Sequence, residues 1–136
     1  MTRRAGLAAL GVVLGALLSP QVGSAQEAAQ KSSFTVDDAQ AKTGGKLFMS
    51  RGCAGCHTVG KGVRAGPDLA GVVDRRELAW LQKWLMNTTE MLASDPIAQE
   101  MLAQYKGTKM PNLKLSQAEA DAVIHFMAAE TAKQKK

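Results

Sequence analysis

Aromatic side chains are scarce in this sequence of 136 residues, which contains three phenylalanines, two tryptophans and one tyrosine. Hydrophobic residues still make up 46% of the chain, which is enough for one packed domain. Aromatic residues supply much of the buried area in an ordinary core. Their scarcity therefore favours a core that is completed by a large apolar cofactor.

The sequence also has no strongly one-sided charge and no strand pattern. Its formal net charge of +5 falls to +3 without residues 1–25, in which Arg3 and Arg4 are the only charged side chains. The other basic residues are scattered, apart from a basic tail at residues 134–136, and few aromatic residues lie among them, so we expect no nucleic-acid partner. Alternating apolar and polar residues are absent over any useful length, and we therefore expect an all-α fold.

A long apolar run is missing as well, but a short one lies near the N-terminus. Arg3 and Arg4 precede an uncharged apolar stretch at residues 5–18, and small residues follow at 23–25. The run is shorter than the roughly 20 residues that span a bilayer. The order predicts a secretory signal peptide at residues 1–25, a periplasmic location and no stable membrane insertion after cleavage. An uncleaved N-terminal anchor is the alternative.

The rest of the chain divides into a flexible segment at residues 26–38, one domain at residues 39–133 and the basic tail. Four helices are expected in the domain. The first begins near Asp37 or Asp38 and ends near Ser50, and the second covers residues 77–87. The third covers residues 95–105, and the last begins after Ser116, which forms a capping-box pattern with Glu119. Residues 59–71 and 108–115 are predicted loops.

Cys53-Ala54-Gly55-Cys56-His57 forms a C-x-x-C-H motif, the pattern of covalent attachment of a c-type haem. Two intervening residues bring both thiols to one edge of the porphyrin, where they add to its vinyl groups, and His57 then follows as an iron ligand. A disulfide or a thioredoxin-like redox pair is one alternative, although the βαβ context is missing. Half of a zinc site is the other, although His125 is the only further strong zinc donor.

The imidazole of His57 needs an acceptor for its other ring nitrogen, and a backbone carbonyl commonly serves. Residues 66–69, with Pro67, form the nearest candidate loop. An ordinary turn proline is the alternative for Pro67.

A second axial ligand has to come from the remaining methionines or from His125. Met110 lies in a loop before Pro111, where its sulfur can point inward. Core packing is the expected role of Met86, Met101 and Met127, Met49 is too near the attachment motif, and Met91 has no comparable context. His125 lies about 200° around its helix from Val123, so we expect a surface histidine. We predict His57 and Met110 as the iron ligands.

With these motifs, the chain resembles class I monohaem cytochromes c over residues 39–133. The resemblance rests on the C-x-x-C-H motif, on RAGPDLAG at residues 64–71 and on KMPNL at residues 109–113. It implies a small cytochrome c fold in which the first and last helices cross at Gly44. It also implies that the Pro67 carbonyl holds His57 and that Met110 is the axial methionine. Residues 88–107 exceed what compact members need and suggest an extra helix.

The expected function is single-electron transfer between periplasmic or membrane redox proteins, with one covalently bound haem c and its iron and without enzyme activity. Two alternatives remain open. The chain could be a haem subunit docked permanently on a periplasmic oxidoreductase, or a haem protein whose open sixth site binds a small molecule. Trp80 or Trp84 could donate an indole N–H to a haem propionate, although core packing is the expected role of both.

Overall fold

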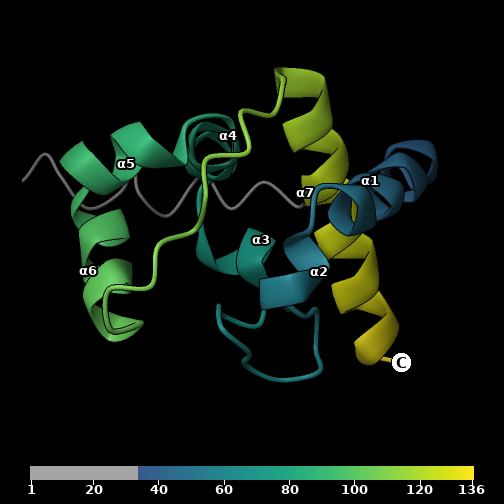
Figure 1. The fold of residues 1–136 in the computed structure, drawn as a ribbon. Helices are drawn as coiled ribbons and strands as arrows, with labels where there is room; N and C mark the ends of the chain where they lie inside the picture. Colours follow the sequence, from purple (N-terminus) through teal and green to yellow (C-terminus); the bar gives the residue numbers. More distant parts are fainter. Residues whose placement is uncertain (1–33) are drawn as a thin grey trace, which may run out of the picture. The chain divides into compact units, whose positions relative to one another are not determined.

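The computed structural model describes residues 34–136, and this part of the chain is built from helices (Figure 1). They are α1 (Asp38–Ser50), α2 (Cys53–Cys56), α3 (Val72–Arg75), α4 (Leu78–Met86), α5 (Thr88–Ser94), α6 (Pro96–Gln104) and α7 (Gln117–Gln134). Residues 34–136 contain no strand, only an isolated bridge between Thr58 and Asp68. None of their helices is long and apolar enough to cross a membrane. The predicted all-α fold is confirmed, whereas the predicted signal peptide and residues 26–33 lie outside the described residues.

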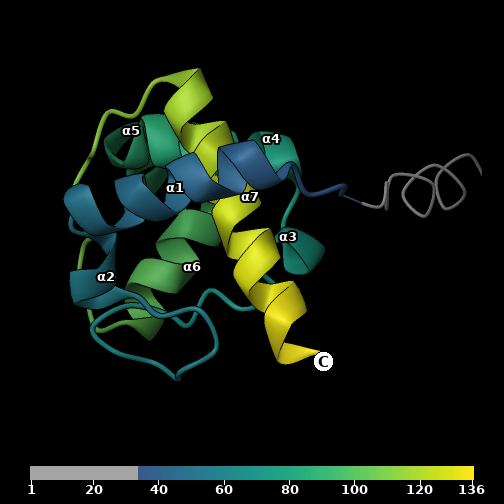
Figure 2. The ribbon, with the colours of Figure 1, turned by 90° about the vertical axis from the view of Figure 1, so that its right-hand side faces the viewer.

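Helices α1 and α7 cross in close contact and form the frame of the fold (Figure 2). The crossing depends on Gly44, because a Cβ atom there would lie 1.9 Å from the carbonyl oxygen of Ala122. Beside this contact the rings of Phe48 and Phe126 pack at a centroid distance of 5.1 Å. The glycine of the first helix thus has the packing role that the sequence suggested.

Side-chain caps fix where the long helices begin. Asp37 accepts a hydrogen bond from the backbone N–H of Gln40 at the start of α1. Ser116 and Glu119 form the predicted capping box of α7. Glu119 also pairs with Arg51, which follows α1, so that the cap of α7 is tied to the end of α1.

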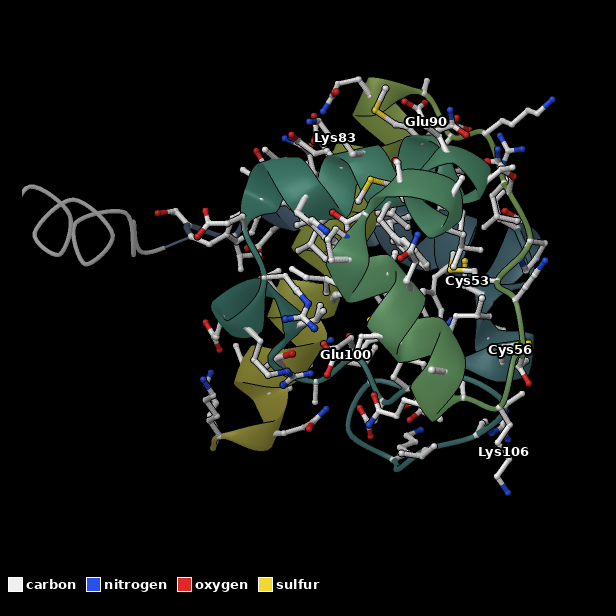
Figure 3. All side chains as sticks on the ribbon, turned by 90° about the vertical axis from the view of Figure 1, so that its left-hand side faces the viewer. Cys53, Cys56, Lys83, Glu90, Glu100 and Lys106 are labelled. Atoms are coloured by element: carbon white, nitrogen blue, oxygen red, sulfur yellow. The ribbon has the colours of Figure 1, made fainter. Side chains whose placement is uncertain are left out.

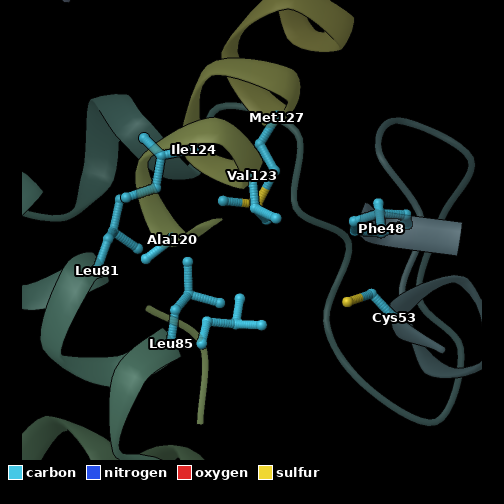
Figure 4. Packing of buried hydrophobic residues seen from close by; sticks show 9 residues of the cluster. Phe48, Cys53, Leu81, Leu85, Ala120, Val123, Ile124 and Met127 are labelled. Atoms are coloured by element: carbon cyan, nitrogen blue, oxygen red, sulfur yellow. The ribbon is translucent and has the colours of Figure 1, made fainter. Parts of the chain in front are cut away.

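The core lies between α7, α4 and the segment that joins α1 to α2. Its buried members are Phe48, Cys53, Leu81, Leu85, Leu115, Ala120, Val123, Ile124 and Met127. Figure 4 shows Leu81 and Leu85 of α4 next to the face of α7 that carries Ala120 and Ile124, with Phe48 and Cys53 across from them. This arrangement brings the cysteine motif to the edge of the core.

The four predicted helices correspond to α1, α4, α6 and α7. Residues 34–136 also form three shorter helices that were not predicted, α2, α3 and α5. The first two are single turns of four residues, and each starts after a glycine with positive φ, Gly52 or Gly71. Helix α5 follows α4 directly, because the side chain of Asn87 accepts the backbone N–H of Glu90 and starts a new helix. The one extra helix expected in residues 88–107 is therefore a pair of helices.

Helices α5 and α6 form an extension on the other side of the molecule from the crossing of α1 and α7 (Figure 1). Asp95 ends α5 and caps α6, where its carboxylate accepts the backbone N–H of Ala98. Gly107 has a φ of 80° and ends this segment as predicted. Among the other helices, α6 packs chiefly on α5.

Candidate functional site

A largely apolar pocket of about 1090 Å³, including its open mouth, lies between the core and the α5–α6 extension. The side chains that the sequence singled out all line it, although they come from different elements: Cys53, Cys56, His57, Pro67 and Met110.

The two cysteines occupy the ends of the single turn α2, so both thiols lie at one edge of the pocket. Cys53 is buried and Cys56 is exposed, and both are free. Burial raises the pKa of the Cys53 thiol above its usual value, against a smaller lowering by a backbone hydrogen bond. Because one sulfur faces the core and the other faces solvent, a group attached to both would be partly enclosed and partly accessible.

His57 leaves the helical turn immediately after Cys56, with φ of −119° and ψ of 153°. Its Nδ1 lies 2.9 Å from the carbonyl oxygen of Pro67, which can only accept, so Nδ1 carries the proton. The predicted contact between His57 and the Pro67 carbonyl is thus present. It leaves the Nε2 lone pair free for a metal ion.

Gly66 allows the loop to approach the imidazole closely. A Cβ atom at this position would lie 2.5 Å from Cε1 of His57, which is too near for any side chain. Backbone hydrogen bonds fasten the same loop to the motif, from the N–H of Gly66 to the Cys56 carbonyl and from the N–H of Leu69 to the Thr58 carbonyl. The position of the ring is therefore set by the main chain.

Asp68 organises the loop that carries Pro67, a role that was not predicted from the sequence. Its carboxylate accepts hydrogen bonds from the backbone N–H groups of Gly60 and Gly62, both at 2.6 Å, and of Ala70 at 2.9 Å. Burial alone would raise its pKa, but these donors together with the Thr58 hydroxyl lower the pKa to about 2. An aspartate within a glycine-rich loop was the signal available in the sequence.

Met110 enters the pocket from the loop between α6 and α7. The loop begins with two residues of positive φ, Lys106 at 54° and Gly107 at 80°. The half-buried Met110 then places its sulfur 3.2 Å from the indole Nε1 of Trp84. A neutral thioether and an imidazole thus line the same pocket, although they are far apart in the sequence.

The other candidate ligands differ in their surroundings. Met101, for which core packing was expected, is half-buried in α6 and lines the pocket. Met127 is buried in the core as predicted and also reaches the pocket, while Met49 is 68% exposed and Met91 is buried in α5. These positions leave Met110 and Met101 as the methionines that approach the pocket without being part of the buried cluster.

His125 does not line the pocket. It is half-buried rather than at the surface, so the prediction of a surface histidine was wrong in this respect. Its Nδ1 accepts the backbone N–H of Asp37 at 3.0 Å, and its ring packs on Phe34 at 4.7 Å. Phe34 and Asp37 belong to the segment that the sequence assigned to a flexible region.

The pocket fits a haem better than the alternative groups. Trp80 lines it, and its Nε1 is buried without a hydrogen-bond partner among residues 34–136. A haem propionate is an acceptor of the kind that this donor needs. In contrast, the same residues contain no cluster of three His, Cys, Asp or Glu side chains that could hold a zinc ion.

Comparisons with known proteins agree with this geometry. The family model described as cytochrome c matches residues 41–130. A cytochrome c from Rhodothermus marinus superposes with a TM-score of 0.68 and 27% identity, over 74% of this chain and 84% of that one. The cytochrome c domain of the pp3183 protein from Pseudomonas putida superposes with a TM-score of 0.60 and 39% identity, over 68% and 91%. No curated protein sequence gives a significant match.

The matched residues include the whole C-x-x-C-H turn, the Pro67 loop and the Met110 loop, and they extend from α1 to α7. The fold, the pocket and the family model thus lead to the same assignment. The chain belongs to the cytochrome c family, and its cofactor is a covalently bound haem c with iron.

Proposed function

We propose that the protein is an exported monohaem cytochrome that carries single electrons between periplasmic or membrane redox proteins. A role as a haem c electron carrier follows from the family. The observation that supports the finer proposal is the meeting of Cys53, Cys56, His57 and Met110 at one apolar pocket. The sequence contains one C-x-x-C-H motif, and hence one attachment site.

Each of these side chains has a distinct role in the proposal. Cys53 and Cys56 hold the haem through thioether bonds, while His57 Nε2 and Met110 Sδ ligate its iron. The bound haem supplies a one-electron Fe(III)/Fe(II) couple. The apolar lining excludes water and disfavours the more highly charged ferric state, which raises the reduction potential. The Pro67 carbonyl fixes the tautomer of His57 through Nδ1.

Electron exchange with another protein needs access to one edge of the cofactor. Cys56 is exposed, and in Figure 3 it lies along the same edge of the molecule as Lys106. Lys109 and Lys114, from the same loop as Met110, are exposed as well. A redox partner with an acidic surface fits this edge, because opposite charge steers encounter without requiring a tight complex.

Export is supported by the sequence of residues 1–25, which precede the described part of the chain. The mature protein is expected to begin at or near Gln26, because the small residues end at Ala25. Mass spectrometry of the protein from the periplasm tests this point. An intact N-terminus on mature protein would favour a membrane-anchored carrier.

The central test is an optical spectrum of the periplasmic protein together with a pyridine haemochrome assay. We expect covalent haem, and in the ferric state a weak band near the red edge of the visible that reports sulfur ligation. Replacing both cysteines by alanine should abolish covalent haem, because the chain has no other cysteine. Haem that resists acid–acetone extraction in that variant would contradict the attachment site.

The sixth ligand is tested with a matched pair of methionines that line the same pocket. Met110→Ala should remove the ferric band, lower the reduction potential and admit carbon monoxide or cyanide. Met101→Ala should leave the band intact, although it also shortens a side chain of the pocket lining. Loss of the band only in Met101→Ala would show that Met101 is the ligand.

A haem subunit that is permanently docked on an oxidoreductase is the second candidate. One similar structure is described as the cytochrome c domain of another protein, which favours it. Helix α6 also presents Ile97, an exposed apolar side chain, on the extension. Gel filtration of the natively expressed protein separates the two, since a free carrier elutes at the mass of one chain.

A further inference from the structure

Trp84 makes a contact that neither core packing nor propionate binding explains. Its indole Nε1 lies 3.2 Å from the sulfur of Met110, 26 residues further along the chain. The indole N–H can only donate, and a thioether sulfur is a weak acceptor, so the direction of this hydrogen bond is fixed. Both side chains are half-buried and line the pocket.

Helix α4 holds this donor in a fixed place relative to the core. Leu81 and Leu85 are buried against α7, and the Nε2 of Gln82 donates to the carboxylate of Asp121 on α7 at 2.8 Å. The ring of Trp84 also stacks on that of Trp80, with centroids 5.4 Å apart and planes 7° from parallel. The direction of the Trp84 N–H is therefore set by the scaffold and not by the methionine loop.

The loop is attached to α4 at a second point. The Nδ2 of Asn112 donates to the Oδ1 of Asn87 at 3.1 Å. Asn87 lies one residue past the end of α4 and about one turn after Trp84, while Asn112 lies two residues after Met110. Two hydrogen bonds, from Trp84 to Met110 and from Asn112 to Asn87, thus fix the loop on the last turn of the helix.

A thioether sulfur has two lone pairs. If one faces the iron, as the proposed function requires, the other can accept the N–H of Trp84. We propose that Trp84 is a positioning residue that acts through Met110 and raises the reduction potential. Its N–H draws electron density from the sulfur, which then donates less to iron. The weaker donation destabilises the ferric state more than the ferrous state, and the reduction potential rises.

Trp84→Phe is the direct test, because it keeps an aromatic ring in the stack and removes the donor. A net hydrogen bond of ordinary strength corresponds to about a fivefold change in an equilibrium constant. The ratio of ferric to ferrous protein at a fixed applied potential should therefore rise by up to about fivefold. At 59 mV per tenfold for a one-electron couple, the reduction potential falls by up to about 40 mV.

A double-mutant cycle shows whether the effect passes through the sulfur. In a Met110→Ala background, Trp84→Phe should leave the reduction potential unchanged, because the acceptor is gone. Trp80→Phe is the matched comparison, since it removes the other indole N–H of the same stack. Any shift that it causes should persist in the Met110→Ala background.

NMR of the ferrous protein gives a second test that does not depend on the reduction potential. The indole N–H proton of Trp84 should exchange with water more slowly in the wild type than in Met110→Ala, as measured by NMR. An unchanged potential in Trp84→Phe with the ferric sulfur band intact would overturn the role of Trp84 alone. Equal shifts of Trp84→Phe in both backgrounds would overturn it as well. Absence of the band in the wild type would instead overturn the ligation by Met110.

Discussion

At the crossing of α1 and α7, the effect of adding one methyl group to a glycine on the free energy of unfolding can be worked out from the structure. Gly44 and Gly45 are adjacent residues in the middle of α1, and each gains about 1 kcal/mol of helix propensity when replaced by alanine. Their surroundings differ. A Cβ atom at Gly44 would lie 1.9 Å from the Ala122 carbonyl oxygen and 2.4 Å from its carbon, whereas at Gly45 it would lie 3.2 Å from the ring of Phe126.

A backbone carbonyl inside α7 cannot rotate away, so Gly44→Ala has to separate the two helices. Overpacking of this kind costs about 1–3 kcal/mol or more, and the loosened pair of Phe48 and Phe126 costs up to about 1.5 kcal/mol further. Because the contact at 1.9 Å places the overpacking cost at the upper end of this range, we expect a net loss of about 2–3.5 kcal/mol after the propensity gain. In Gly45→Ala the aromatic ring can shift by a few tenths of an ångström, so its stability should change by less than about 1 kcal/mol in either direction.

Thermal unfolding of the two holoproteins, followed by far-UV circular dichroism, measures the difference. At about 4–8 °C per kcal/mol for a domain of this size, the melting temperatures of the two variants should differ by roughly 10–20 °C. Equal stability of Gly44→Ala and Gly45→Ala would refute the reasoning, because helix propensity alone would then account for both. A lower yield of Gly44→Ala holoprotein would support the same conclusion as lower stability, because the haem-attachment turn follows Arg51 directly after α1 and depends on the position of that helix.

Three further expectations concern the site and its surroundings. The pKa of Asp68 is about 2 in the folded state and 3.8 ordinarily. The ionised carboxylate therefore contributes its full stabilisation above a pH of about 4, and this stabilisation is lost as the pH falls towards 2. The difference in unfolding midpoint between wild type and Asp68→Asn should therefore shrink over that pH range, and a constant difference would contradict the role of the carboxylate. Gly66→Ala should push the ring of His57 away from Pro67, so that denaturant removes the Soret band at lower concentration than in Gly55→Ala, where a Cβ atom meets nothing within 4 Å. In a chain without attached haem, amide exchange should become fast in α6, which packs chiefly on α5, and stay slower where α1 meets α7; equal protection of both would contradict this.

The long helices could be predicted because their signals are local. Asp37, Asp95 and Ser116 each cap a helix in the structure, close to where the sequence predicted that a helix begins. Helix α5 was missed because Asn87 caps it immediately after α4, within a polar stretch that lacks an apolar stripe long enough to show a period. The turns α2 and α3 are too short to have a periodic pattern at all.

The residues of the site also fall into those that local sequence signals predict and those that only the fold brings together. Cys53, Cys56 and His57 could be found because their chemistry requires neighbouring positions in the chain. The role of Asp68 in its loop and the contact of Trp84 with Met110 depend on which backbone and side-chain donors the fold brings together. The second contact joins residues 26 positions apart, and no spacing rule connects them.

Met101 shows why helical periodicity cannot separate a core residue from one that faces a cofactor. Both kinds of position are apolar and recur with the helical period, so the sequence pattern of α6 is the same whether its inner face meets protein or haem. What distinguishes Met110 in the structure is a polar neighbour, since its sulfur accepts an indole N–H. A methionine that serves only to fill space gains little from such a donor, whereas a methionine that ligates a metal ion must be held in one orientation. The hydrogen bond to the sulfur, more than its burial, is therefore the feature that favours Met110 over Met101 as the ligand.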